Sequence, residues 1–129
     1  MDLQPLILIA DRNRHVREFL RRELEAEGYR VELARDGHEV WRRLKEAEPP
    51  DLLILDPETP YVGELGVLEG LKEHQPALPV VIYTLEEGSA PALETQGQSV
   101  CLEKENTDRL KAAIAVLLRQ KSVHRLPSR

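Results

Sequence analysis

The segment Leu6-Ile-Leu-Ile-Ala-Asp11 is a short apolar run that ends on an acidic residue. The same arrangement recurs at Asp51-Leu-Leu-Ile-Leu-Asp56, and a third apolar run ends beside Thr84. Runs of four or five apolar residues bounded by polar residues or proline are typical of buried strands in a parallel sheet. We therefore predict three central strands, at Leu6 to Ala10, Leu52 to Leu55 and Val80 to Tyr83.

Segments with helical spacing separate these strands. The first has Val16, Phe19, Leu20 and Leu24 on one face, which predicts a helix between a cap at Asn13 and an end at Gly28. The other predicted helices are a second opened by Asp36 and Gly37 and reaching Leu44, a third that starts at Gly63 or Glu64 and runs through Leu65, Leu68 and Leu71, a short fourth between Ser89 and Gln96, and a last one capped by Asn106 or Thr107.

Two further strands complete the pattern. Tyr29 to Ala34 alternates apolar and charged residues, which suits an edge strand, and Ser99 to Leu102 is a last short strand. Strands that alternate with helices predict an α/β fold with a doubly wound, five-stranded parallel sheet. We expect one domain over residues 1–121, followed by a short tail at 122–129.

Composition narrows the classes of function. The formal charge of −5 argues against a direct nucleic-acid ligand, and we interpret the scattered cations of the last helix and tail as a solvated helix end. Trp41 and Phe19 are predicted to be core or groove residues rather than nucleotide stackers. The single Cys101 allows no internal disulfide, and no apolar run is long enough for a signal peptide or membrane span. We expect a cytoplasmic protein with no membrane contact.

Polar residues stand at four predicted strand ends: Asp11, Asp56, Thr84 and Lys104. Any one of them alone could merely cap a turn or remain a surface charge. In a doubly wound sheet, however, ligands bind beyond the carboxyl ends of the strands, where these side chains should meet. Carboxylates, a hydroxyl and an ammonium are the groups that handle an anion beside a divalent cation.

This order of residues, with Pro60 after Asp56 and Glu103 before Lys104, resembles the receiver domain of two-component response regulators, a flavodoxin-like (CheY-like) fold. The resemblance covers nearly the whole chain, and it implies the strand order 2-1-3-4-5. It implies that Asp56 accepts a phosphoryl group, with Thr84 as the switch hydroxyl and Lys104 as the phosphate contact. It also implies that Mg²⁺ is held by Asp11, Asp56 and the backbone carbonyl of Glu58.

Four positions depart from the family pattern. Arg12 stands where the family has the second residue of its acidic pair, Glu105 replaces the proline after the lysine, and Cys101 replaces a switch aromatic. Leu85 follows Thr84, where a small residue is common. Arg12 is expected to pair with Asp11 or Asp56 without any metal, and so to weaken Mg²⁺ binding.

The leading hypothesis is a stand-alone, non-enzymatic receiver. A sensor histidine kinase or phosphotransfer protein would phosphorylate it, and the signal would pass to a downstream protein, or to a second copy, through the face of the fourth helix, fifth strand and fifth helix. The alternative is a degenerate pseudo-receiver that acts as a phosphorylation-independent interaction module. An aspartyl-phosphate phosphatase is disfavoured because Glu58 and Pro60 break its nucleophile loop, and Asp11-Arg-Asn-Arg14 is not a phosphate cradle for a flavodoxin-like cofactor.

Overall fold

The computed structural model describes residues 4–84, 99–103 and 107–125. Its five strands form one parallel sheet in the order β2-β1-β3-β4-β5, which confirms the predicted topology. The strands are β1 (Leu6–Ala10), β2 (Arg30–Ala34), β3 (Leu52–Leu55), β4 (Val80–Thr84) and β5 (Ser99–Glu103). The helices are α1 (Arg14–Ala26), α2 (Gly37–Leu44), α3 (Val67–His74) and α4 (Thr107–Arg125).

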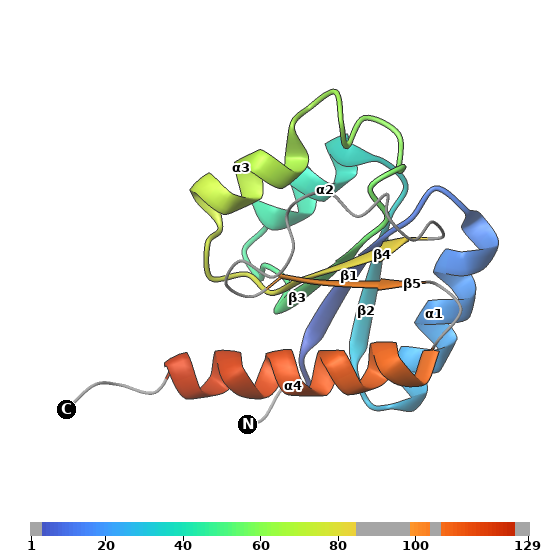
Figure 1. Cartoon of the computed structure of the whole chain (residues 1–129), viewed down its shortest axis with the longest axis vertical. Helices are drawn as coiled ribbons and strands as arrows, with labels where there is room; N and C mark the ends of the chain where they lie inside the picture. The colour runs from blue at the N-terminus through green and yellow to red at the C-terminus, as the bar shows by residue number, and fades with distance from the viewer. Residues whose placement is uncertain (1–3, 85–98, 104–106, 126–129) are drawn as a thin grey trace.

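The helices cover both faces of the sheet, as Figure 1 shows, with α2 and α3 on one side and α1 and α4 on the other. Each side has its own apolar core. Leu8, Leu53 and Ile82 pack under α2 and α3, whereas the alternate strand residues pack under α1 and α4. β1, β3 and β4 are buried along their whole length, because a central parallel strand has helices on both of its faces.

The predicted signals for the first two helices are confirmed. The side chain of Asn13 accepts hydrogen bonds from the backbone N–H groups of His15 and Val16, at 2.8 and 3.3 Å, and so caps α1. Gly28 follows the end of this helix with a φ of 96°, which glycine adopts without strain. Asp36 caps α2 by accepting from the N–H of Glu39.

The predicted start of the third helix was wrong. We expected it at Gly63 or Glu64, but the chain forms turns up to Gly66, and α3 starts at Val67. Tyr61 and Gly66 have φ values of 66° and 59°, and this left-handed conformation interrupts a right-handed helix. The turns belong to the loop that follows Asp56, so their geometry matters for the site.

Phe19 was also predicted wrongly, because 44% of it is exposed. Leu20 lies at the centre of the buried stripe of α1, between Val16 and Leu24. At roughly 100° per residue, Phe19 is displaced by about 100° from the stripe centre, at the edge of the apolar face. Trp41, in contrast, is partly buried against the core under α2 and α3, as expected.

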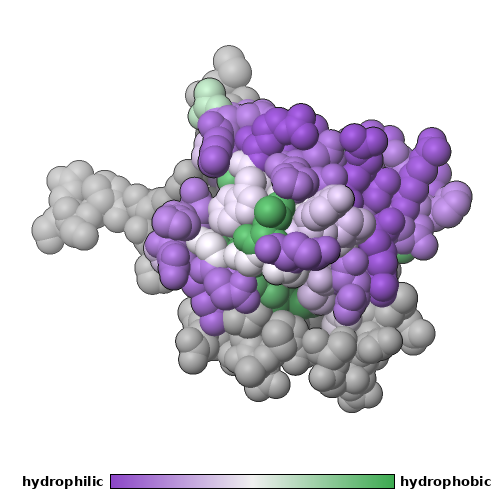
Figure 2. Space-filling model, turned by 90° about the horizontal axis from the view of Figure 1, so that it is seen from above, coloured by the Kyte–Doolittle hydropathy of each residue, from purple (hydrophilic) through white to green (hydrophobic). Residues whose placement is uncertain are grey.

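The large exposed apolar residues of the described part of the chain are Phe19, Tyr61, Leu65 and Val116, which lie on different elements. Figure 2, seen from above, shows a mainly hydrophilic surface around a small hydrophobic centre. No helix in the described ranges is long and apolar enough to cross a membrane. The predicted short fourth helix, at Ser89 to Gln96, lies outside the described residues.

Candidate functional site

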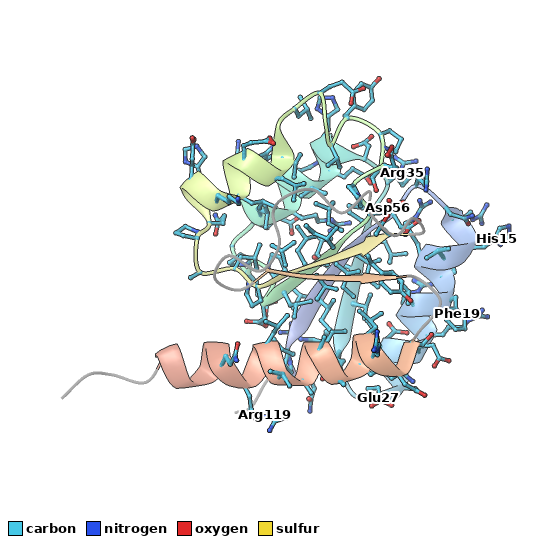
Figure 3. The ribbon with its side chains drawn as sticks, in the orientation of Figure 1. His15, Phe19, Glu27, Arg35, Asp56 and Arg119 are labelled. Atoms are coloured by element: carbon cyan, nitrogen blue, oxygen red, sulfur yellow. The ribbon has the colours of Figure 1, made fainter. Side chains whose placement is uncertain are left out.

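The carboxyl ends of β1, β3 and β4 bring three of the predicted site residues to one end of the sheet. Ala10 is paired with Leu55 in the strand register, so the next residues, Asp11 and Asp56, lie on neighbouring strands at the same level. Thr84 ends β4, the neighbour of β3. All three are buried, with exposed fractions of 2%, 0% and 4%. Figure 3 shows Asp56 at the same end of the sheet as Arg35, which directly follows β2.

Asp56 is fixed by its own backbone and by the loop after it. Its N–H donates to the carbonyl of Ala10 at 2.8 Å, which extends the β1·β3 pairing by one step. Its carboxylate Oδ1 accepts a hydrogen bond from the N–H of Glu58 at 3.0 Å, and its carbonyl accepts from the N–H of Thr59. The side chain is therefore held in a tight turn, as aspartates often are after a strand.

The second oxygen of Asp56 faces a guanidinium group. Arg12 Nε lies 3.2 Å from Asp56 Oδ2, and the Arg12 side chain is 41% exposed whereas that of Asp56 is fully buried. The predicted pairing of Arg12 with one of the two acids is thus present. Both carboxylate oxygens of Asp56 consequently have a donor within hydrogen-bond distance.

Asp11 has a different set of partners. Its Oδ1 accepts from the N–H of Asn13 at 2.8 Å, which orients the turn between β1 and α1. Its main-chain carbonyl accepts from Arg17 Nη1 at 2.6 Å. Arg17 was not anticipated from the sequence. It lies in the first turn of α1, just after the Asn13 cap, and that position could have indicated a side chain able to reach back to the end of β1.

The loop after Asp56 packs against the start of α2. Gly37 donates its N–H to the carbonyl of Pro60 at 2.8 Å. Thr59 is 2% exposed, and its hydroxyl oxygen has no hydrogen-bond partner within the described part of the chain. The ring of Tyr61 contacts that of His38, with 4.9 Å between centroids. The position of this loop therefore depends on the close approach of α2.

Tyr83 joins the site to α4. Burial raises the pKa of its hydroxyl, a hydrogen bond with Thr107 lowers it, and the negative charge of Asp11 raises it further. The ring packs in the core under α1 and α4. Tyr83 thus connects the strand that ends at Thr84 to the start of the last helix.

The predicted Mg²⁺ ligands can be compared with what the ion requires. Mg²⁺ needs six oxygen ligands in near-octahedral geometry, usually one or two carboxylates with several waters. Here Asp11 and Asp56 supply carboxylates, but Arg12 lies against one Asp56 oxygen and the N–H of Glu58 against the other. No group of three or more potential metal-binding side chains occurs among the described residues. Because the guanidinium of Arg12 already lies against Asp56 Oδ2, and residue 12 supplies no carboxylate, this arrangement does not fit a divalent ion.

Several predicted positions cannot be placed. Lys104 and Glu105 lie outside the described residues, as does Leu85 after Thr84. For Cys101 the structure describes the backbone, which belongs to β5, and not the side chain. The structure therefore brings together Asp11, Arg12, Asp56 and Thr84.

Comparison with known proteins gives consistent results. A sequence model described as the response regulator receiver domain matches residues 7–115. The response regulator MprA of Mycobacterium ulcerans is 41% identical over 78 residues, which cover 60% of this chain and 33% of that protein. The same regulator of Mycobacterium avium gives the same identity over 34% of its length. The aligned part is thus about a third of these relatives.

Solved receiver structures have the same fold. The response regulator TrrA of Thermotoga maritima, in complex with Mg²⁺ and BeF, has a TM-score of 0.77 at 26% identity, over 88% of this chain and 99% of that one. The receiver domain of a LuxO repressor from Vibrio parahaemolyticus has a TM-score of 0.80 at 21% identity, over 95% of both chains. With the sheet order and the family match, these likenesses identify the chain as a member of the response regulator receiver domain family of two-component signalling.

Proposed function

We propose that this receiver accepts a phosphoryl group on Asp56 and passes the signal on by contact with another protein. The observation that supports this most directly is the position of Asp56, buried beside Asp11 and Thr84 where three parallel strands end. Ligands bind doubly wound sheets at this edge, where the loops can differ without disturbing the core. The phosphoryl donor would be a sensor histidine kinase or a phosphotransfer protein.

The transfer forms one bond and breaks one. A carboxylate oxygen of Asp56 attacks the phosphorus atom, and the bond between phosphorus and the donor nitrogen breaks. The nitrogen keeps the electron pair and takes up a proton, so an acyl phosphate and a free imidazole result. Positive side chains assist by neutralising the equatorial oxygens of the phosphoryl group. Thr84 and Lys104 would contact the product.

The test is incubation with a small phosphodonor, such as acetyl phosphate, with and without Mg²⁺, followed by intact-mass measurement. We expect the mass to rise by one phosphoryl group in the wild type and not in Asp56→Asn. Asp51→Asn is a matched control, since Asp51 precedes the opposite end of β3, where it accepts from the N–H of Leu6 at 2.8 Å. No gain in the wild type, or a gain that persists in Asp56→Asn, would refute the proposal.

A second candidate is an interaction module that works without phosphate. The ion pair between Arg12 and Asp56 favours it, because that pair already supplies the acceptor carboxylate with an opposite charge. Such a module would bind its protein partner, or a second copy, equally well with Asp56→Asn. A partner affinity that changes on phosphorylation of Asp56 would exclude it. The proposed contact region is the face of β5 and α4 together with the predicted fourth helix, which lies outside the described residues.

A further inference from the structure

We propose that Arg12 is a resident cation that takes the place of Mg²⁺ at this site, so that the chemistry of Asp56 does not depend on a divalent ion. The part of this inference that concerns phosphorylation rests on the proposed function. The part that concerns metal affinity does not. The carrying observation is the 3.2 Å contact between Arg12 Nε and the fully buried carboxylate of Asp56.

The charges at the site support the proposal that Arg12 takes the place of Mg²⁺. Asp11 and Asp56 carry two negative charges, and Arg12 and Arg17 bring two positive charges to the same strand ends. Arg17 binds the main-chain carbonyl of Asp11, so it also uses an oxygen at the position where β1 ends. The charges of these four side chains therefore cancel, whereas two neighbouring carboxylates alone would favour a bound cation.

A divalent ion would also be repelled. Arg12 would stand about 5 Å from an ion bound to Asp56, and at an effective dielectric constant near 20 the repulsion weakens binding at least a hundredfold before screening by salt. Displacing Arg12 first would break its contact with Asp56. The ion would lose one ligand of the usual acidic pair in either case, because residue 12 is not an acid.

A guanidinium is chemically suited to this role. It is permanently charged, and its planar set of N–H groups can hold two phosphoryl oxygens at once. Arg12 is 41% exposed, so the outer part of its side chain is not locked in the core. When Asp56 becomes an acyl phosphate, its carboxylate loses its negative charge. The Arg12 side chain can then move outward with the added phosphoryl group.

The alternative is that Arg12 is only a surface charge whose pairing with Asp56 has no effect on the chemistry. Four proteins separate the two hypotheses: the wild type, Arg12→Asp, Arg12→Gln and Arg14→Asp. Arg14 is the matched control, because it is exposed, lies two residues away at the start of α1, and undergoes the same change in charge.

The first measurement is Mg²⁺ affinity, by calorimetry and by the fluorescence of Trp41, the single tryptophan. We expect Arg12→Asp to bind Mg²⁺ at least about a hundredfold more tightly than the wild type and Arg14→Asp. Arg12→Gln should gain less than Arg12→Asp, because it removes the repulsion without adding a ligand. Equal Mg²⁺ affinity in wild type and Arg12→Asp would overturn the inference, whether or not Asp56 is ever phosphorylated.

The second measurement is the mass gain with acetyl phosphate, in EDTA and in Mg²⁺. We expect the wild type to gain the mass of one phosphoryl group in both solutions. Arg12→Gln should show no gain in EDTA, and Arg12→Asp should be phosphorylated only in Mg²⁺. A wild type that is phosphorylated only with Mg²⁺ would overturn the inference and leave the proposed function intact. A wild type with no gain in either would instead overturn the proposed function, and the affinity measurement would then decide the role of Arg12.

Discussion

Replacement of Gly37 by alanine should destabilise the protein, because α2 and the loop after Asp56 meet there. A Cβ on Gly37 would lie 2.7 Å from the carbonyl oxygen of Tyr61, 2.9 Å from its carbonyl carbon and 3.1 Å from the nitrogen of Val62. All three are backbone atoms, so no side-chain rotation relieves the contact. The hydrogen bond from Gly37 to Pro60 would also be strained.

Two effects of opposite sign determine the magnitude. Alanine in a helix is favoured over glycine by up to about 1 kcal/mol. Overpacking against groups that cannot move costs about 1 to 3 kcal/mol. At the first residue of α2 the helical gain is small, so we expect a net loss of about 1 to 2 kcal/mol in the free energy of unfolding. This corresponds to a fall of roughly 3 to 10 °C in Tm for a domain of this size.

Urea unfolding followed by circular dichroism and Trp41 fluorescence measures this loss. Gly63→Ala is the control, since a Cβ at Gly63 meets nothing within 4 Å. It should change stability by less than about 0.5 kcal/mol. A Gly37→Ala variant as stable as Gly63→Ala would show that the loop is not held against α2 as described.

Three further predictions concern stability. Leu53→Ala and Ile82→Ala, both in fully buried strands, should each cost about 2 to 5 kcal/mol, and unchanged thermal melts would contradict the strand assignment. Tyr61 has a φ of 66°, which asparagine adopts more readily than tyrosine and valine less readily. In chemical unfolding, Tyr61→Asn should therefore raise the free energy of unfolding by about 0.5 to 1 kcal/mol, and Tyr61→Val should lower it by at least as much. The pKa of Glu39 is lowered from 4.5, chiefly by the backbone N–H of Arg35, so its contribution is complete above pH 4.5 and is lost as the pH falls through the lowered value. Over that pH range the free energy of unfolding should change less with pH in Glu39→Gln than in the wild type. The same pH dependence in both proteins would exclude the contact between Glu39 and Arg35.

The sequence predicted the sheet well because its signals are strong and local. Apolar runs such as Leu6 to Ala10 are buried in full, and caps such as Asn13 and Asp36 act as expected. The start of the third helix was predicted wrongly because tertiary contacts determine the conformation of the loop before it. The left-handed turn at Tyr61 depends on the approach of α2, and neither residue type nor spacing in the loop indicates it.

At the site, the positions of Asp11, Asp56 and Thr84 followed from the fold, since any residue that ends β1, β3 or β4 must reach the same edge. The pairing of Arg12 was expected, but its choice of Asp56 over Asp11 was not determined by the sequence. Asp11 already uses one oxygen for the N–H of Asn13, and Arg17 covers its carbonyl, whereas Asp56 Oδ2 faces the turn that carries Arg12. The structure therefore pairs Arg12 with the proposed phosphoacceptor, and the proposed independence of Asp56 from Mg²⁺ rests on that pairing.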